Sequence, residues 1–471
     1  MPTRHSFDLA TLENGIRVWH APSKCGVLYL EFTVLVGFQN EVEDGLLEFC
    51  HANEHMAAKW TSRKFPNAAA NTEFFTQNSI ETNAFTTVDM TGYHMRGLCE
   101  FAKPMIDRFC ATFAEPAYDH RVFDAEMAAV QNELGNIVNG EWHTLDEAIA
   151  GALYAGTPLA AGERAKIANV QRLRDGGETG MQMLLGWRNT SYHPGLCSVS
   201  VFGDCPAYLL DTLKKRLSTI KGAVRELPCI SNDSRVLSRQ RDVLAADARY
   251  DSFHRIVFMF PLEFSTFEYE PRAAVECLSY VLSSGLGSRL YRELRTKRKL
   301  VYSVGSAPQL FVCAKMKSYF CIDTKFQVTD GDVAAQRRKV KDGVFVVLRA
   351  LGRGGVTDEE MGQWKIANRT AKLFARGEAG SARGAHPDPN AFFDTCDYAQ
   401  RQLCFLHMFR PDYFSCSKAS HLPTGVVSKL EYLEMRQRVT KAQCRQMAHT
   451  LEPSKALVFA SDRVGNRAAN K

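Results

Sequence analysis

Residues 26–60 read GVLYLEFTVLVGFQNEVEDGLLEFCHANEHMAAKW and pass from one periodicity to another. The first part, which ends at Gly37, is rich in β-branched and aromatic residues and predicts a strand of a sheet. From Asp44 to Trp60 apolar residues recur at helical spacing, which predicts a helix. The stretch therefore predicts a strand that leads into an amphipathic helix.

Two histidines and a glutamate share one face of this predicted helix. His51 and His55 are four residues apart, and Glu54 lies three residues after His51, so the three side chains stack on one face. Two imidazole nitrogens suit zinc, and a catalytic zinc normally takes three protein ligands and leaves one position to water. Glu54 would lie near enough to accept a proton from that water. The alternative is a pair of solvated histidines on an ordinary helix, and these residues alone leave both interpretations open.

A third zinc ligand would have to come from elsewhere in the fold. The helix predicted over 119–138 carries Glu126 and Glu133, which are two helical turns apart and hence lie on one face. Either carboxylate could reach a neighbouring helix. The alternative is that both belong to the charged, solvent-exposed face of an amphipathic helix.

The order of predicted elements repeats along the chain. Residues 224–252 lack clear periodicity and are interpreted as an interdomain linker between a first half at 1–223 and a second half at 253–471. The helix of the second half that corresponds to 44–60 contains no histidine, so the first half is predicted to bind the metal. The other predicted elements are strands at 80–95, 196–204 and 254–262, helices at 97–115 and 271–282, and an exposed loop at 374–390.

Composition excludes several classes of protein. The chain has 471 residues with 58 basic and 52 acidic side chains, and this mild, scattered charge does not favour a nucleic-acid partner. Its fourteen cysteines form no CxxC pair, which favours a reducing compartment over a disulfide framework. Apolar runs fall short of the roughly 18 to 20 residues that span a membrane, so no membrane span is predicted. Strand-like alternation begins almost at the first residue, which leaves no room for a long presequence but leaves a very short basic one open.

The five polar residues resemble a known motif. His51, Glu54 and His55, with Glu126 and Glu133 downstream, are similar to the HxxEH and E-x6-E pattern of the pitrilysin/insulinase family of inverted-zincin metallopeptidases. The resemblance covers most of the chain. Its other segments are GFQNE (37–41), ETNAFTTVDMTGYHM (81–95), GTPLAAGERAKIANV (156–170), WRNTSYHPGLCSVSVFGD (187–204) and GLGSRLYRELRTKRKLVYSV (285–304).

This resemblance implies a fold and a role for each site residue. The expected fold is α+β, with two homologous α/β-sandwich halves, each a mostly antiparallel sheet covered by helices, that together form a clam-like cleft. The expected zinc ligands are His51, His55 and Glu133, with Glu54 as the general base and Glu126 orienting a histidine. Peptide substrate would bind along the edge strand at Asn83 and Ala84, and Arg295 and Tyr302 of the second half would contact its backbone.

The resemblance also implies an activity and its context. The expected function is a zinc-dependent endopeptidase that cleaves extended peptides or presequences. Size and two-domain layout are most similar to the mitochondrial processing peptidase beta subunit and its bacterial relatives. That similarity implies a homologous partner subunit, in a homodimer or heterodimer, and the mitochondrial matrix, with the cytoplasm left open. The alternative is a catalytically silent structural subunit, like the core proteins of a respiratory complex.

Three residues depart from the family pattern. Asn53 stands within the apolar stripe of the histidine helix, Lys299 stands where a glycine is common, and Trp60 replaces a small residue. A buried amide without a partner costs roughly 1 to 3 kcal/mol, so Asn53 is expected either to find a hydrogen bond or to shift the helix.

Overall fold

The computed structural model describes residues 8–42, 45–222, 242–246, 253–264, 268–310, 318–328, 332–379 and 429–462. These residues form two compact units. Residues 8–136 and 157–222 belong to the first unit, and residues 137–156, together with the described residues from 242 to 374 and from 430 to 462, belong to the second. No helix in these described ranges is long and apolar enough to cross a bilayer.

The first unit is built on a six-stranded sheet. Its strands lie in the order β1-β2-β6-β3-β5-β4, and all neighbours are antiparallel except β2 and β6. This order leaves β4 at one edge. The strand bounds are β1 (Asp8–Thr11), β2 (Arg17–Pro22), β3 (Val27–Val34), β4 (Glu81–Thr86), β5 (Thr91–Leu98) and β6 (Cys197–Gly203).

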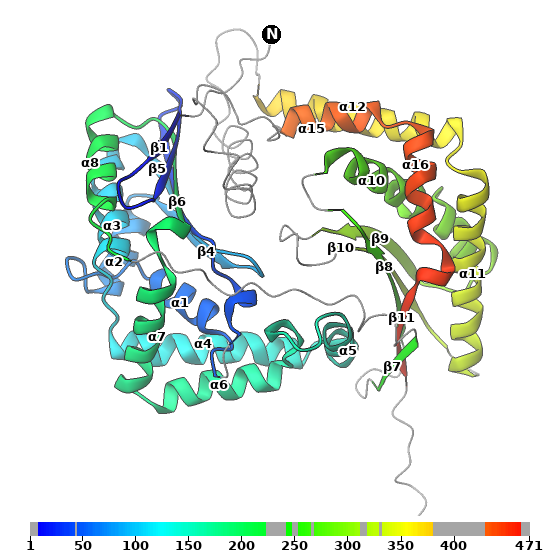
Figure 1. Cartoon of the computed structure of the whole chain (residues 1–471), viewed down its shortest axis with the longest axis horizontal. Helices are drawn as coiled ribbons and strands as arrows, with labels where there is room; N and C mark the ends of the chain where they lie inside the picture. The colour runs from blue at the N-terminus through cyan, green and yellow to red at the C-terminus, as the bar shows by residue number, and fades with distance from the viewer. Residues whose placement is uncertain are drawn as a thin grey trace, which may run out of the picture. The chain divides into compact units, whose positions relative to one another are not determined.

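Helices cover one face of this sheet, where α3 and α8 pack together (Figure 1). Because side chains alternate along a strand, Leu28, Leu30 and Phe32 of β3 all enter this core. Helices α4, α6 and α7 build a second core with α1. The helix bounds are α1 (Phe49–Ala57), α2 (Ala68–Gln77), α3 (Ala102–Ala114), α4 (His120–Val138), α6 (Glu163–Asp175), α7 (Glu178–Ser191) and α8 (Ala207–Leu217).

The second unit contains a five-stranded sheet in the order β7-β11-β8-β10-β9, with β7 and β11 parallel and the other neighbours antiparallel. Its strands are β7 (Asp242–Ala246), β8 (His254–Leu262), β9 (Ser303–Gln309), β10 (Ser318–Phe326) and β11 (Leu457–Asp462). Its helices are α5 (His143–Leu153), α10 (Tyr269–Ser283), the π-helix η5 (Tyr291–Lys297), α11 (Val333–Gly354), α12 (Asp358–Ala379), α15 (Lys429–Arg438) and α16 (Lys441–Ala448).

The two sheets have the same topology. In the first, the series β2-β6-β3-β5-β4 contains one parallel pair followed by three antiparallel pairs, and the series β7-β11-β8-β10-β9 repeats that pattern with the strands in the same chain order. Only β1 lacks a counterpart among the described strands of the second sheet. The predicted α+β fold, with two related sheets covered by helices, is confirmed.

Residues 137–156 lie within the range 1–223 that the sequence assigns to the first half, yet they cluster with the second unit. The reason is apolar packing. Leu145 and Leu153 of α5 are buried against Val257 and Met259 of β8. Both faces of β8 are therefore covered, which accounts for the continuous apolar run of that strand.

Local corrections follow from backbone conformation. The predicted helix 44–60 is shorter, because Gly45 and Glu48 adopt φ values of +85° and +70° and α1 begins only at Phe49.

The loop predicted at 374–390 is wrong for residues 374–379, which continue α12. A single glycine costs a helix only about 1 kcal/mol, and the neighbouring residues favour helix. Residues 380–390 lie outside the described ranges. Within the predicted linker 224–252, residues 242–246 form β7.

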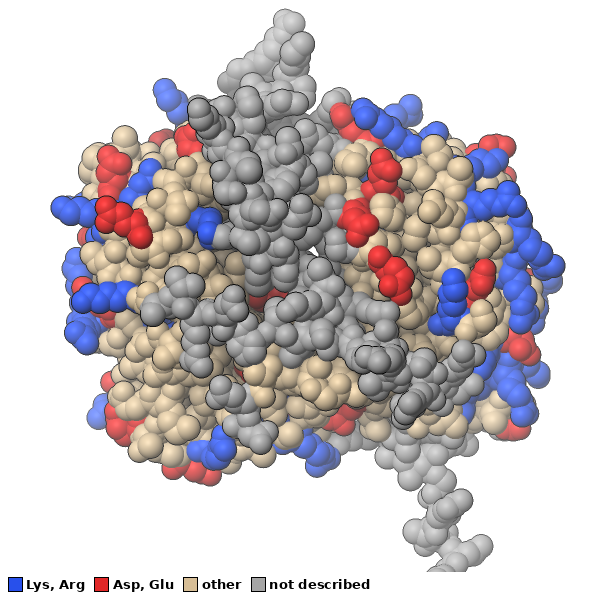
Figure 2. Space-filling view, viewed as in Figure 1, with Lys and Arg blue, Asp and Glu red and all other residues tan. Residues whose placement is uncertain are grey.

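Basic side chains gather over α11 in Figure 2. α11 is amphipathic, with Val340, Val344 and Leu348 buried on its inner side. Its charged residues include both signs, since Asp332 and Asp342 flank the arginines and lysines. This pattern is typical of the solvated face of a surface helix. The basic residues of the helix are Arg337, Arg338, Lys339, Lys341, Arg349 and Arg353.

Lys299, where the family commonly has glycine, adopts a left-handed conformation with φ +54° just after η5. A side chain with a Cβ is strained there, whereas glycine is not. We expect Lys299→Gly to raise the free energy of unfolding by about 0.5 to 1 kcal/mol, measured by calorimetry or denaturant titration. Lys297→Gly, inside η5, is the matched control and should lower it by about 1 kcal/mol, because it adds the same freedom to the unfolded chain without relieving strain. Equal effects of the two changes would contradict the prediction.

Candidate functional site

Packing on two sides determines which face of α1 remains accessible. One side contributes to the core of the first sheet, and a second side packs against α4, α6 and α7. The third side carries His51, Glu54 and His55, each only partly buried. The buried residues are Cys50 and Ala57 on the first side and Phe49, Ala52 and Met56 on the second.

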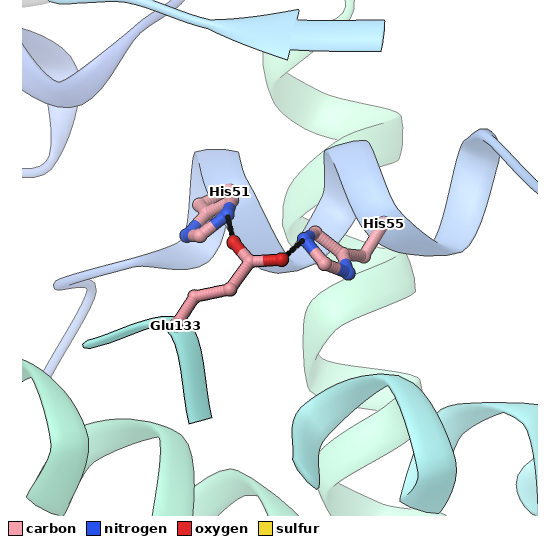
Figure 3. Close-up of side chains that lie close together, drawn as sticks. All are labelled: His51, His55 and Glu133. Atoms are coloured by element: carbon pink, nitrogen blue, oxygen red, sulfur yellow. Dashed lines mark ion pairs between the residues drawn. The ribbon is translucent and has the colours of Figure 1, made fainter. Parts of the chain in front are cut away.

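Glu133 of α4 lies between the two histidines (Figure 3). Its carboxylate oxygens are 3.2 Å from Nε2 of His51 and 3.6 Å from Nε2 of His55. One donor atom from each of the three side chains lies within 4.8 Å of the others. Two imidazole nitrogens and a carboxylate oxygen at this spacing form a donor set that suits zinc.

The outer nitrogen of each imidazole also meets a carboxylate. Nδ1 of His51 lies 2.8 Å from Glu48, and Nδ1 of His55 lies 3.1 Å from Glu126. Histidines that bind metals almost always have their other ring nitrogen held in this way, because the hydrogen bond fixes the tautomer and the ring orientation. The surroundings of both histidines therefore fit a metal site as well as the donor atoms do.

Nearby charges shift the pKa of two groups at this site, His51 and Glu126. Burial lowers the pKa of His51, but the hydrogen bond and charge of Glu48, together with the charges of Glu54 and Glu133, outweigh it, so this pKa is raised overall. Burial raises the pKa of Glu126, but the hydrogen bonds from His55 and Lys59 outweigh it, so this pKa is lowered. Nζ of Lys59 lies 2.7 Å from Glu126. A metal must displace a proton from protonated His51, so its binding should weaken as the pH falls.

The carboxylate of Glu54 points toward the edge strand. Its Oε2 accepts a hydrogen bond of 2.7 Å from Oγ1 of Thr86, at the end of β4, and α1 packs directly against β4. Asn83 and Ala84 lie on the same strand, paired with His94 and Tyr93 of β5. Oδ1 of the exposed Asn83 accepts from the N–H of Ala84 at 2.9 Å. The structure thus places the predicted base next to the predicted peptide-binding strand.

Contacts within the first unit accommodate the departures Asn53 and Trp60. The buried amide of Asn53 donates to Phe49 O and accepts from the hydroxyl of Tyr118, both at 2.9 Å, which confirms that it finds hydrogen bonds. Trp60 has φ +55° and packs among aromatic rings of the core, including Phe75 and Phe109.

Arg295 and Tyr302 lie together in the second unit. The Arg295 guanidinium donates to the backbone oxygen of Tyr302 and lies 5.3 Å from the centre of its ring. The Tyr302 side chain is largely exposed, so its hydroxyl remains accessible to solvent. The structure brings these two predicted residues into contact with each other, and their role toward substrate stays a prediction.

Sequence reasoning missed three residues of the site. Glu48 contacts His51, Lys166 lies 3.7 Å from Glu48, and Thr86 donates to Glu54. The spacing of three residues from Glu48 to His51 is a signal that could have indicated a contact. Lys166 and Thr86 come from other elements, and their spacing from the histidine helix carries no signal of contact.

The turn between β4 and β5 contains a buried carboxyl group. Asp89 accepts from Gln39 at 3.1 Å, and burial raises the pKa of Asp89 to about 6. The folded state holds this proton more tightly than the unfolded state does, so the free energy of unfolding should fall as the pH rises from about 4 to about 6.

Asp89→Asn is expected to remove this contribution, because asparagine keeps the acceptor oxygen and carries no charge. At neutral pH the variant should be more stable by roughly 2 to 3 kcal/mol, and its stability should vary less between about pH 4 and 6. Denaturant titrations across that range measure both effects. The exposed Asp211→Asn on α8 is the control, and an equal change in that variant would contradict the prediction.

Two family descriptions match this chain. "Insulinase (Peptidase family M16)" matches residues 33–163, and "Peptidase M16 inactive domain" matches residues 181–367. The first range contains the histidine helix and both glutamates of α4, and the second contains Arg295 and Tyr302. The chain therefore belongs to peptidase family M16, the pitrilysin/insulinase family.

Relatives with curated names include peptidases. Insulin-degrading enzyme from Bos taurus is 28% identical over 162 residues, which are 34% of this chain and 15% of that enzyme. The uncharacterized zinc protease YmxG of Bacillus subtilis is 23% identical over 318 residues, which are 66% of this chain and 70% of YmxG. The match thus spans only about 15% of the length of the insulin-degrading enzymes from Bos taurus and Homo sapiens.

Solved structures share the fold over nearly the whole chain. A protease from Helicobacter pylori has a TM-score of 0.72 at 17% identity and covers 98% of this chain and 100% of its own. Pitrilysin has a TM-score of 0.68 at 15% identity and covers 98% of this chain and 45% of its own. These comparisons support the family and not the finer likeness to the processing peptidase beta subunit.

Proposed function

We propose that this protein is a zinc-dependent endopeptidase. One observation carries the proposal: the inner nitrogens of His51 and His55 converge on the Glu133 carboxylate, while a further carboxylate holds each outer nitrogen. A solvated pair of histidines needs no such double set of carboxylates. Membership of the M16 family and likeness to zinc proteases support the same activity.

His51, His55 and Glu133 would hold the ion. A zinc ion held there would supply Lewis acidity and lower the pKa of a water molecule at the site. Glu54 would accept a proton from that water and later deliver it to the amine of the departing peptide. Thr86 would keep the Glu54 carboxylate turned toward the substrate strand. Glu126 would fix the orientation of His55.

Substrate would bind as an extended peptide along β4. This strand is at the sheet edge, and main-chain pairing with an edge strand binds a peptide with little regard to its side chains. Asn83 would have to release the N–H of Ala84, or share it, when a peptide arrives. Arg295 and Tyr302 would contact the peptide backbone from the second half, as the family resemblance implies.

The experiment has two readouts, zinc content and cleavage. The full chain, purified and exposed to zinc, should hold about one ion per chain, and His51→Ala should lose it. The zinc-loaded chain should cleave unstructured peptides and spare a folded protein. A chain that binds zinc but cleaves no peptide, alone or with a homologous partner, would favour the silent structural subunit instead. A folded chain that binds no zinc would exclude the peptidase.

The finer resemblance to the processing peptidase beta subunit supplies three further proposals: presequence substrates, a homologous partner subunit and a mitochondrial matrix location. Peptidase assays with basic presequence peptides, beside acidic peptides of equal length, test the first of them. Equal rates for both would contradict it. Co-purification of the tagged chain from fractionated cells tests the partner and the compartment together.

A further inference from the structure

Glu48 has an unusual backbone conformation for its position. It immediately precedes α1 and is left-handed, with φ +70° and ψ +10°, while its side chain is almost completely buried. A residue with a Cβ is strained in this region, and glycine would not be. Non-glycine residues persist in such conformations where the surrounding structure determines them, often because the side chain is needed.

Neighbouring groups fix this backbone from both sides. The buried Glu41 carboxylate accepts the N–H groups of Glu48 and Cys50, at 2.9 and 2.8 Å. From α6, Asn169 donates to Leu47 O, and Arg172 donates to Gly45 O at 2.8 Å. The loop before α1 is therefore held in one conformation, and Glu48 enters the interior at a set angle.

Both oxygens of the Glu48 carboxylate lie close to a side-chain nitrogen. Oε2 lies 2.8 Å from Nδ1 of His51, and Oε1 lies 3.7 Å from Nζ of Lys166. The second histidine has an equivalent arrangement, since Glu126 contacts both His55 and Lys59. Each histidine is thus backed by a carboxylate that is itself paired with a lysine.

We propose that Glu48 is a positioning residue of the metal site: its carboxylate, paired with Lys166 and set in place by the fixed backbone before α1, keeps the His51 proton on Nδ1 and leaves Nε2 for the metal. This inference rests on the proposed function, because it assigns Glu48 a role toward the same zinc. The competing interpretation is that Glu48 only begins the helix. Glycine would then serve equally well, since it adopts φ +70° without strain.

Glu48→Gly separates the two interpretations in the full chain. We expect its zinc affinity, measured by competition with a chromophoric chelator, to fall by about tenfold to a hundredfold, the usual cost of losing such a partner. We also expect the zinc-free variant to fold, because the strain at this position is relieved. Glu48→Gln, of equal size, provides a second variant if the glycine chain is unstable, and it should lose affinity in the same direction.

Glu163→Gln is the matched control, since Glu163 pairs with the same lysine at 3.1 Å and its loss removes the same charge. It should keep the affinity of the wild-type chain. The proposal is overturned if Glu48→Gly binds zinc as tightly as the wild type does, or if Glu163→Gln weakens binding equally.

A readout without metal distinguishes failure of this inference from failure of the proposed function. ¹⁵N NMR of the zinc-free chain, at a pH where imidazole is neutral, should show His51 protonated on Nδ1 in the wild type and no longer biased to Nδ1 in Glu48→Gly. An unchanged tautomer overturns the inference, even if the chain binds zinc. If the tautomer differs between the wild type and Glu48→Gly but the wild-type chain binds no zinc, Glu48 is still the residue that orients His51. That outcome excludes the peptidase proposal and not the role of Glu48.

Discussion

Glu54→Gln is expected to lower peptide cleavage by about 10²- to 10⁴-fold, the range that a lost general base produces. Glutamine has the same shape and can still accept the hydrogen bond from Thr86, so the local structure should survive. What it loses is the ability to take a proton. Zinc content should stay at the wild-type level, because Glu54 is not among the three converging donors.

The measurement is a single-turnover cleavage assay on zinc-loaded protein, with metal content determined on the same sample. Glu73→Gln, an exposed position on α2, is the matched control and should cleave like the wild type. Full activity in Glu54→Gln would exclude Glu54 as the base. Loss of zinc together with activity would instead indicate that Glu54 binds or supports the metal.

Glu133→Gln should release the metal. Its carboxylate is the only one among the described residues that contacts the inner nitrogens of both histidines, at 3.2 and 3.6 Å. Removing its charge takes away a direct donor, so zinc affinity should fall by more than the tenfold to hundredfold loss that is typical for a supporting carboxylate. Competition with a chelator of known affinity measures the loss.

Glu126→Gln is the informative comparison, since Glu126 lies on the same helix and meets the outer nitrogen of His55 rather than an inner nitrogen. We expect its affinity to fall by about tenfold to a hundredfold. If Glu126→Gln loses zinc more completely than Glu133→Gln does, the two glutamates have exchanged roles and the assignment of Glu133 as the third ligand is wrong.

The parts of the site that could be predicted are those with local signals. His51, Glu54 and His55 fall within a single stretch of helix, and Glu126 and Glu133 are two turns apart on another. Which glutamate meets the histidines depends on how α4 packs against α1, and helical spacing contains no such information. Only the family resemblance distinguished them.

Other features depend on contacts between distant segments. Residues before α1 follow a helical pattern, yet Gly45 and Glu48 are left-handed because α6 and Glu41 hold them there. β7 pairs with β11, more than two hundred residues away in the sequence, and a five-residue segment without clear periodicity gives no sign of such pairing. Asn53 interrupts an apolar stripe, and the hydroxyl that satisfies it belongs to Tyr118.

The position of α5 limits how the gene for this protein can be divided. The chain leaves the first unit after residue 136, supplies α5 to the second sheet, and rejoins the first unit at residue 157. A fragment of residues 1–223 would expose Leu145 and Leu153, whose burial is worth about 1.5 to 3 kcal/mol each. We expect that fragment to self-associate on size-exclusion chromatography, and less so when both leucines are replaced by glutamine. A gene divided or recombined within the codons for residues 224–252 would encode α5 apart from the strands that it covers. We therefore expect the two halves to be kept in one gene.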